Sequence, residues 1–193
     1  MKIISVSLFI VLIVGLSVFV SQCQVAEQKG VIIIYASRYG STARTAEWIA
    51  EGMGGKAVAV PLNDAGDLRS YEKVILGSGI YFDQLHQDMS AFLETRGEEV
   101  RKKLLAIFVV CGTPPDQAQG YLDKFAEKCK ATPLLMKAFN GWTKKELLSP
   151  EDYKSLEDYY KSINEPFDNY DKTDKGKCLA FGKEILAKMP NVK

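Results

Sequence analysis

An apolar strand, a polar turn and an amphipathic helix follow one another without a break between residues 30 and 54. Residues 31–36 are uncharged and mostly β-branched, a pattern typical of a parallel strand that is covered on both faces. Residues 37–42 form a turn that holds a glycine and three short hydroxyl side chains. The helix that follows repeats its small and apolar residues at three- and four-residue spacing, at Thr42, Ala46, Ile49, Ala50 and Met53. Its free amides and positive dipole end point at the turn, which predicts a phosphate cradle.

Two interpretations of this turn stay open from the residues alone. A serine-rich turn before a helix is also typical of a simple N-cap. The stronger phosphate motifs are absent, since the chain has neither G-x-x-x-x-G-K-[ST] nor G-x-G-x-x-G at this point. Neither a P-loop nor a dinucleotide fingerprint is therefore supported. The remaining ligand class is a small dianion held by hydroxyls and amides, without a lysine or magnesium.

Residues 1–29 are expected to be an appendage rather than part of the folded domain, which we place at residues 30–193. Lys2 is followed by an uncharged apolar run over residues 3–20. A cleaved signal peptide, an uncleaved membrane anchor and a lipoprotein signal with lipid on Cys23 all fit this pattern. Each of them predicts a domain that is exported or membrane-anchored and faces away from the cytoplasm.

The rest of the chain carries no net charge. The whole sequence has 25 basic and 24 acidic residues, and setting aside Lys2, Lys29 and Glu27 leaves 23 of each. No basic stripe with interleaved aromatics is present, so nucleic acid is not an expected partner. The cysteines at 111, 129 and 178 lack CxxC spacing. We therefore expect no metal site, and we interpret the three as buried small apolar residues.

Strands and helices alternate along the domain, which predicts a doubly wound α/β fold. Five parallel strands in this rhythm favour the order 2-1-3-4-5, with ligand at the carboxyl ends of the strands. Polar or glycine-rich loops follow the first, third and fourth strands, so these loops are expected to converge. The expected strands are 31–36, 56–60, 73–80, 104–110 and 134–140, and the expected helices are 42–53, 87–103 and 121–129, one that begins near 149, and 176–188.

Several stretches carry a resemblance to a known family. Residues 34–42 and 76–81, the downstream His86, and the ending from 171–174 to 181–182 resemble the flavodoxin-domain family. Within it the chain is most similar to the branch of flavodoxin-like, quinone-coupled protoporphyrinogen oxidases. The resemblance covers roughly residues 30 to 189 and implies a flavodoxin-like five-stranded parallel sheet.

The resemblance also implies non-covalent binding of FMN. The phosphate loop would be Ser37, Arg38, Tyr39, Gly40, Ser41 and Thr42, the loop beside the isoalloxazine ring Ser78, Gly79, Ile80, Tyr81 and Phe82, and the third loop Gly112 and Thr113. Hydroxyls and amides suit the phosphate, and Tyr81 or Phe82 suits stacking on the ring. Arg38 either pairs with the phosphate or points to solvent. The third loop has no aromatic residue directly after its strand, so no second stacking partner is identified.

Two function classes follow. The first is an FMN-dependent redox protein, an electron carrier or oxidoreductase, whose partner is a redox protein or a quinone. The second is an exported flavodoxin-fold interaction module without flavin, because fold does not fix function. His86, the only histidine, is expected on the surface at the start of a helix. No nucleophile and base can be paired from the sequence, so no catalytic residue is named.

Overall fold

The computed structural model describes residues 29–189. The predicted signal or anchor segment, including Cys23, lies outside these residues except for Lys29, which belongs to the first strand. Within the described part of the chain, no helix combines the length and the apolar character needed to cross a membrane.

The core of the molecule is a sheet of five parallel strands in the spatial order β2-β1-β3-β5-β6, and a short strand, β4, pairs antiparallel with β3. Counted along the five parallel strands this is the order 2-1-3-4-5, so the predicted topology is confirmed. The main strands are β1 (Lys29–Ala36), β2 (Ala57–Pro61), β3 (Tyr71–Tyr81), β5 (Leu104–Cys111) and β6 (Leu135–Asn140), and β4 is Gln84–Leu85.

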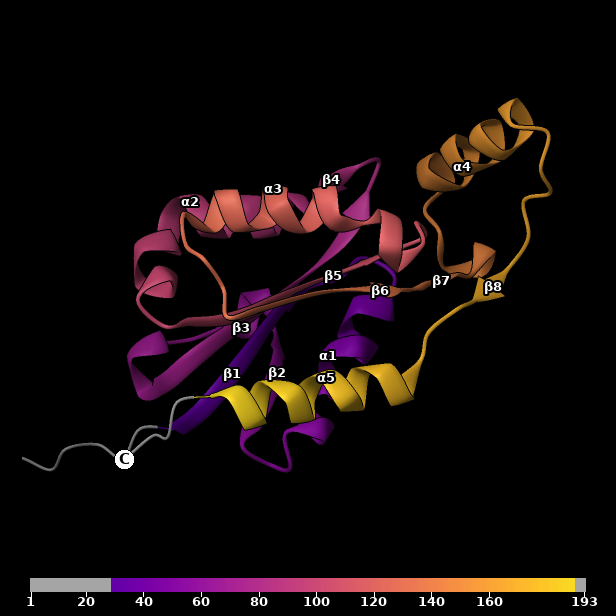
Figure 1. Ribbon diagram of the computed structural model, residues 1–193. Helices are drawn as coiled ribbons and strands as arrows, with labels where there is room; N and C mark the ends of the chain where they lie inside the picture. Colours follow the sequence, from indigo (N-terminus) through magenta and orange to yellow (C-terminus); the bar gives the residue numbers. More distant parts are fainter. Residues whose placement is uncertain (1–28, 190–193) are drawn as a thin grey trace, which may run out of the picture.

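Helices cover both faces of this sheet (Figure 1). One face packs against α1 (Ser41–Gly52) and α5 (Lys175–Lys188), and the other against α2 (Gln87–Arg101) and α3 (Gln119–Cys129). Successive residues of β1 alternate between the two cores: Val31 and Ile33 lie with α1 and α5, whereas Ile32 and Ile34 lie with α2 and α3. Burial on both faces explains why this strand is an unbroken apolar run.

The segment between β6 and α5 leaves the sheet and returns. It contains β7 (Trp142–Thr143), α4 (Pro150–Ser162) and β8 (Tyr170–Asp171), and β7 pairs antiparallel with β8. Figure 1 shows α4 beyond the edge of the sheet. The sequence predicted the start of α4, and the Ser149 hydroxyl does cap it by accepting from Asp152 N at 3.1 Å. The 3-10 turns are η1 (Leu62–Asp64), η2 (Leu68–Ser70), η3 (Pro115–Gln117) and η4 (Lys145–Leu147).

The three cysteines of the domain are buried free thiols, as expected. Burial raises the pKa of Cys129 to about 12 and that of Cys178 to about 11, so both thiols are neutral and unreactive at physiological pH. Among residues 29–189, no group of three or more His, Cys, Asp or Glu side chains is placed to hold a metal ion.

Candidate functional site

The three loops singled out in the sequence lie at one edge of the sheet. Strands β1 and β3 are neighbours, with Ala36 opposite Ser78, and β3 and β5 are neighbours, with Gly79 opposite Val110. Because parallel strands end at the same edge, the turns after β1, β3 and β5 emerge together, at the place where open α/β sheets bind their ligands.

The turn after β1 leads directly into α1. Gly40 is the N-cap residue and has a φ of 91°, a left-handed conformation that favours glycine. The Ser37 hydroxyl accepts from Gly40 N at 3.1 Å, so this hydroxyl stabilises the turn rather than capping the helix. The first turn of α1 contains no acidic residue. The helix therefore begins with amides that have no intrahelical acceptor and with no negative side chain to neutralise its dipole.

Thr42 supplies an independent sign of a ligand at this helix end. The residue is 1% exposed, and its Oγ1 has no hydrogen-bond partner among the described residues. A buried hydroxyl without a partner costs about 1–3 kcal/mol, and such groups are rare in native proteins. An anion at the N-terminus of α1 would give this hydroxyl an acceptor, so the residues present fit a bound phosphate.

Tyr81 ties the turn after β1 to the end of β3. Its Oη accepts from Arg38 N at 2.8 Å, and its ring lies so close to Gly79 that a Cβ there would come within 2.7 Å of the ring. The ring also meets Tyr39 and His86 edge-on, with centroid distances of 6.2 and 5.5 Å. Burial raises the pKa of the Tyr81 phenol, which is neutral at physiological pH. Tyr81, itself part of the predicted ring loop, thus connects that loop to the predicted phosphate loop.

Asp152 of α4 holds the same turn from outside the sheet. Its Oδ2 accepts from the Arg38 guanidinium at 2.6 Å and from Tyr39 Oη at 2.5 Å. Burial acts to raise the pKa of Asp152, but the hydrogen bonds from Tyr39 and Arg38 outweigh it and hold the pKa below its usual range. Arg38, expected to meet phosphate or solvent, is instead paired with a carboxylate, although 40% of its side chain is exposed.

The connection from β6 to β7 covers the turn as well. Trp142 Nε1 donates to Tyr39 O at 2.8 Å. Gly141 lies against Ser41, where a Cβ would come within 2.8 Å of the Ser41 hydroxyl. A side chain at position 141 would therefore displace one of the hydroxyls at the start of α1.

Ser78 and His86 have structural partners. The Ser78 hydroxyl is fully buried, donates to Gly79 O at 2.9 Å and accepts from His86 N at 3.0 Å. His86 is half-buried and caps α2, since its Nδ1 accepts from Asp88 N at 3.2 Å. Burial lowers the pKa of His86, which favours the neutral ring that this cap requires. The predicted position of His86 at a helix start is confirmed, but its side chain is only 12% exposed and does not lie on the surface as expected.

Phe82 and Asp83 form the tip of a tight hairpin between β3 and β4. Ile80 pairs with Leu85 across this hairpin. Phe82 and Asp83 have φ values of 48° and 60°, and Phe82 is 62% exposed. Positive φ at both central residues is the geometry of a type I′ hairpin turn, and it is uncommon for a residue as bulky as Phe82. The hairpin therefore presents an exposed aromatic ring at the edge where the loops meet.

The third loop is hydrogen-bonded to β6. Thr113 O accepts from Asn140 Nδ2 at 2.9 Å, and Gly112 lies against the Tyr170 hydroxyl. Gly112 is exposed and Thr113 is half-buried. The structure thus joins the first two predicted loops directly and places the third beside them, without a hydrogen bond to either.

Asp152, Trp142 and Gly141 are the site residues that sequence reasoning missed. Asp152 was expected only as part of the helix that begins near residue 149. The sequence offered one signal for these contacts, because Gly141 and Trp142 directly follow the last predicted strand. A glycine lets a neighbouring segment approach the backbone closely, and a tryptophan places a large ring beside it.

A family model described as a flavodoxin domain matches residues 32–155. Oxidised Flavodoxin 1 from Bacillus cereus is 22% identical, with 83% of this chain and 99% of that chain covered and a TM-score of 0.55. Two-electron reduced Megasphaera elsdenii flavodoxin is 16% identical, with 81% and 98% covered and a TM-score of 0.53. A flavodoxin from the domain Archaea is also 16% identical, with 82% and 97% covered and a TM-score of 0.52. No curated protein has a sequence that matches this chain. Because these identities are low, the likeness to the solved structures shows a shared fold only.

Proposed function

The chain belongs to the flavodoxin-domain family, and from this premise we propose that it binds FMN without a covalent bond and acts as a redox protein. The observation that carries the proposal is the buried, unpartnered Thr42 hydroxyl at the N-terminus of α1, where no side chain neutralises the helix dipole. A phosphate group satisfies both requirements at once, because it accepts hydrogen bonds and carries negative charge.

The residues of the site divide into two groups in this proposal. Ser41, Thr42 and the first amides of α1 would hold the phosphate, while the exposed ring of Phe82 would pack on the isoalloxazine. Tyr81 and Asp152 would position the turn, because each is already bonded to it. When bound, FMN supplies transfer of one or two electrons, and the protein tunes it by contacts and burial.

The partner and the location are further parts of the proposal. We propose a quinone or a redox protein as the electron partner. The neutral charge balance of the domain gives no support to long-range steering toward a strongly charged partner. The apolar run at residues 3–20 supports a membrane-anchored or exported protein. A protoporphyrinogen-oxidase-like reaction rests on the sequence motifs alone. Assaying the protein with protoporphyrinogen and a quinone tests it directly.

The cofactor is tested by purifying the full chain after expression in a reducing cytoplasm, recording its visible spectrum and identifying any released chromophore by chromatography. We expect a flavin spectrum and released FMN. A colourless protein that also fails to take up added FMN would contradict the proposal and favour the flavin-free interaction module. That second candidate has one observation in its favour: Tyr81 and Ser37 already accept from the amides of Arg38 and Gly40, so two amides of the turn are engaged within the protein.

A further inference from the structure

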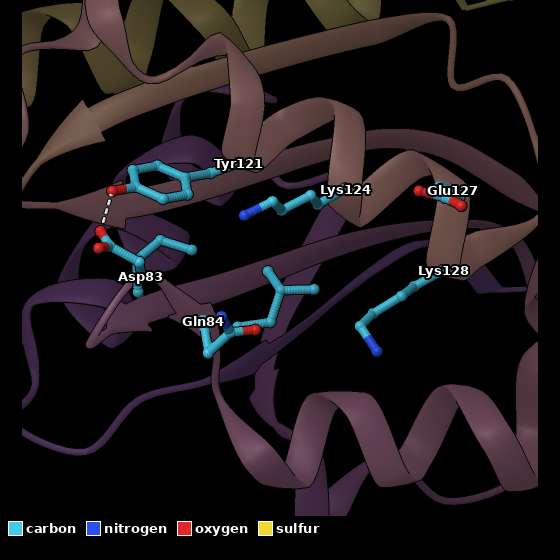
Figure 2. A pocket seen from close by; sticks show the side chains of 8 residues that line it. Asp83, Gln84, Tyr121, Lys124, Glu127 and Lys128 are labelled. Atoms are coloured by element: carbon cyan, nitrogen blue, oxygen red, sulfur yellow. Dashed lines mark hydrogen bonds between the residues drawn. The ribbon is translucent and has the colours of Figure 1, made fainter.

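A pocket lies on the face of the sheet opposite to α1. It encloses about 310 Å³ between the β3–β4 hairpin and the side of α3. Figure 2 shows Asp83 and Gln84 on the hairpin side and Tyr121, Lys124, Glu127 and Lys128 on the α3 side. Its volume is at the lower end of the range typical of small-molecule sites. Because α1 packs on the opposite face of the sheet, this pocket is distinct from the proposed phosphate site.

The pocket is lined by apolar residues on one side and by two lysines on another. Leu85, which is 8% exposed, and Ile80 supply apolar surface from the hairpin. Lys124 and Lys128 lie one helical turn apart on α3, and Figure 2 shows both side chains extending from the helix on the hairpin side. Both lysines are exposed, and neither ammonium group has an ion-pair partner among the carboxylates of residues 29–189. Two unpaired cations beside an apolar surface favour a ligand that has both an anionic and an apolar part.

The acidic residues of the pocket limit the charge of such a ligand. The Asp83 carboxylate is already engaged, since it accepts from the Tyr121 hydroxyl. Glu127 lies between the two lysines in the sequence of α3 and also lines the pocket. Two carboxylates beside two ammonium groups leave the lining without net charge, so it gives a highly charged anion no long-range attraction, and recognition rests on the two lysines together with the apolar surface.

The pocket is also pre-formed. The hairpin that makes one wall is fixed by the pairing of Ile80 with Leu85 and by the Asp83–Tyr121 hydrogen bond to α3. Binding would therefore need little ordering of the chain, which is what small sites require for useful affinity. We propose that this pocket binds a small amphipathic monocarboxylate, with the carboxylate between Lys124 and Lys128 and the apolar body against Leu85 and the Tyr121 ring.

The test is a titration of the isotope-labelled full chain with cinnamate, followed through backbone amide NMR shifts. We expect saturable shifts at the hairpin and along α3. The neutral isostere cinnamamide should bind about tenfold more weakly, and the double variant Lys124→Gln, Lys128→Gln should lose about as much affinity for cinnamate. Lys183→Gln is the matched control, because Lys183 is an exposed lysine of α5 on the opposite face of the sheet.

Three results would overturn the inference. Equal binding of cinnamate and cinnamamide would show that the lysines do not recognise a carboxylate. Cinnamate shifts that leave the hairpin and α3 unaffected would place the ligand elsewhere. Inorganic phosphate that competes as well as cinnamate would point to a simple anion site without an apolar requirement. The titration uses the flavin-free protein, because Ile80 lines the pocket and also belongs to the predicted ring loop. The shifts along α3 then report on the pocket whether or not the chain binds FMN.

Discussion

Replacing Thr42 by valine should change stability and cofactor affinity in opposite directions. Valine keeps the shape of the side chain and replaces the hydroxyl by a methyl group. Because the Thr42 hydroxyl is buried and without a partner, we expect its removal to raise the free energy of unfolding of the FMN-free protein by about 1 kcal/mol. A hydrogen bond to a charged phosphate is worth about 1.5–3 kcal/mol, so the FMN dissociation constant should rise by about 10- to 100-fold.

Thr45 provides a matched control within the same helix. It is also fully buried, and its Oγ1 likewise has no hydrogen-bond partner in the described chain beyond the Cys178 thiol that it faces, a weak bonding group. Thr45 lies one turn further along α1, away from the free amides. Thr45→Val should therefore raise stability to a similar extent and leave FMN affinity unchanged. Urea unfolding of the FMN-free protein gives the first quantity, and quenching of flavin fluorescence during titration gives the second.

Comparing the FMN affinities of the two variants tests whether the Thr42 hydroxyl contacts the phosphate. If Thr42→Val keeps the FMN affinity of the unchanged protein, the hydroxyl does not touch the phosphate and the cradle is misplaced. If both variants lose affinity equally, the effect comes from the packing of α1 and not from a contact with ligand.

Three further predictions concern the residues around the turn. Asp152→Asn should lower the free energy of unfolding by about 1–2 kcal/mol in urea titrations at neutral pH, since Arg38 stays partly solvated when its partner is lost. The pKa of Asp152 is depressed in the folded protein, so Asp152 stabilises the fold fully above its unfolded pKa of about 3.9. This stabilisation is lost as the pH falls through the folded pKa. The unchanged protein and Asp152→Asn should therefore have the same stability in strong acid. Gly141→Ala should weaken FMN binding about tenfold by displacing Ser41, and unchanged binding in a flavin titration would refute this. Phe82→Gly should stabilise the FMN-free protein by about 1 kcal/mol in thermal unfolding by relieving positive φ, yet reduce flavin retention; wild-type retention would exclude a stacking role.

The sheet order was predictable because the strands are buried on both faces. The unbroken apolar runs of β1 and β5 could pack only between two helical layers, and that arrangement restricts the connections between them. The strand ends were less predictable. β1 begins at Lys29, earlier than expected, because Lys29 pairs with Tyr71. β3 extends to Tyr81 because Tyr81 pairs with Gln84 of β4, a strand too short to leave a periodic signal.

The site was predictable only in its local part. The turn, its hydroxyls and the start of α1 are contiguous in the sequence, so residue type and spacing were enough. The contact of Arg38 with Asp152 joins residues 114 positions apart, and nothing in either local pattern indicates it. Either Tyr81 or Phe82 was expected to stack on the flavin. The structure adds a role for Tyr81 that was not expected, because its hydroxyl accepts from Arg38 N.

The pairing of β7 with β8 brings the two ends of the α4 excursion together, with Trp142 opposite Asp171. Because β7 and β8 hold the two ends of this segment together, a longer loop between them would cost little free energy of folding. The loop-closure cost is only about 0.6 kcal/mol for each doubling of the loop length. The exposed stretch at 163–166, which follows α4, lies far along the chain from Asp152 and contains none of the residues that touch the turn. It is therefore a natural graft point, where a reporter peptide or a fused domain could be inserted while the docking of α5 stays undisturbed.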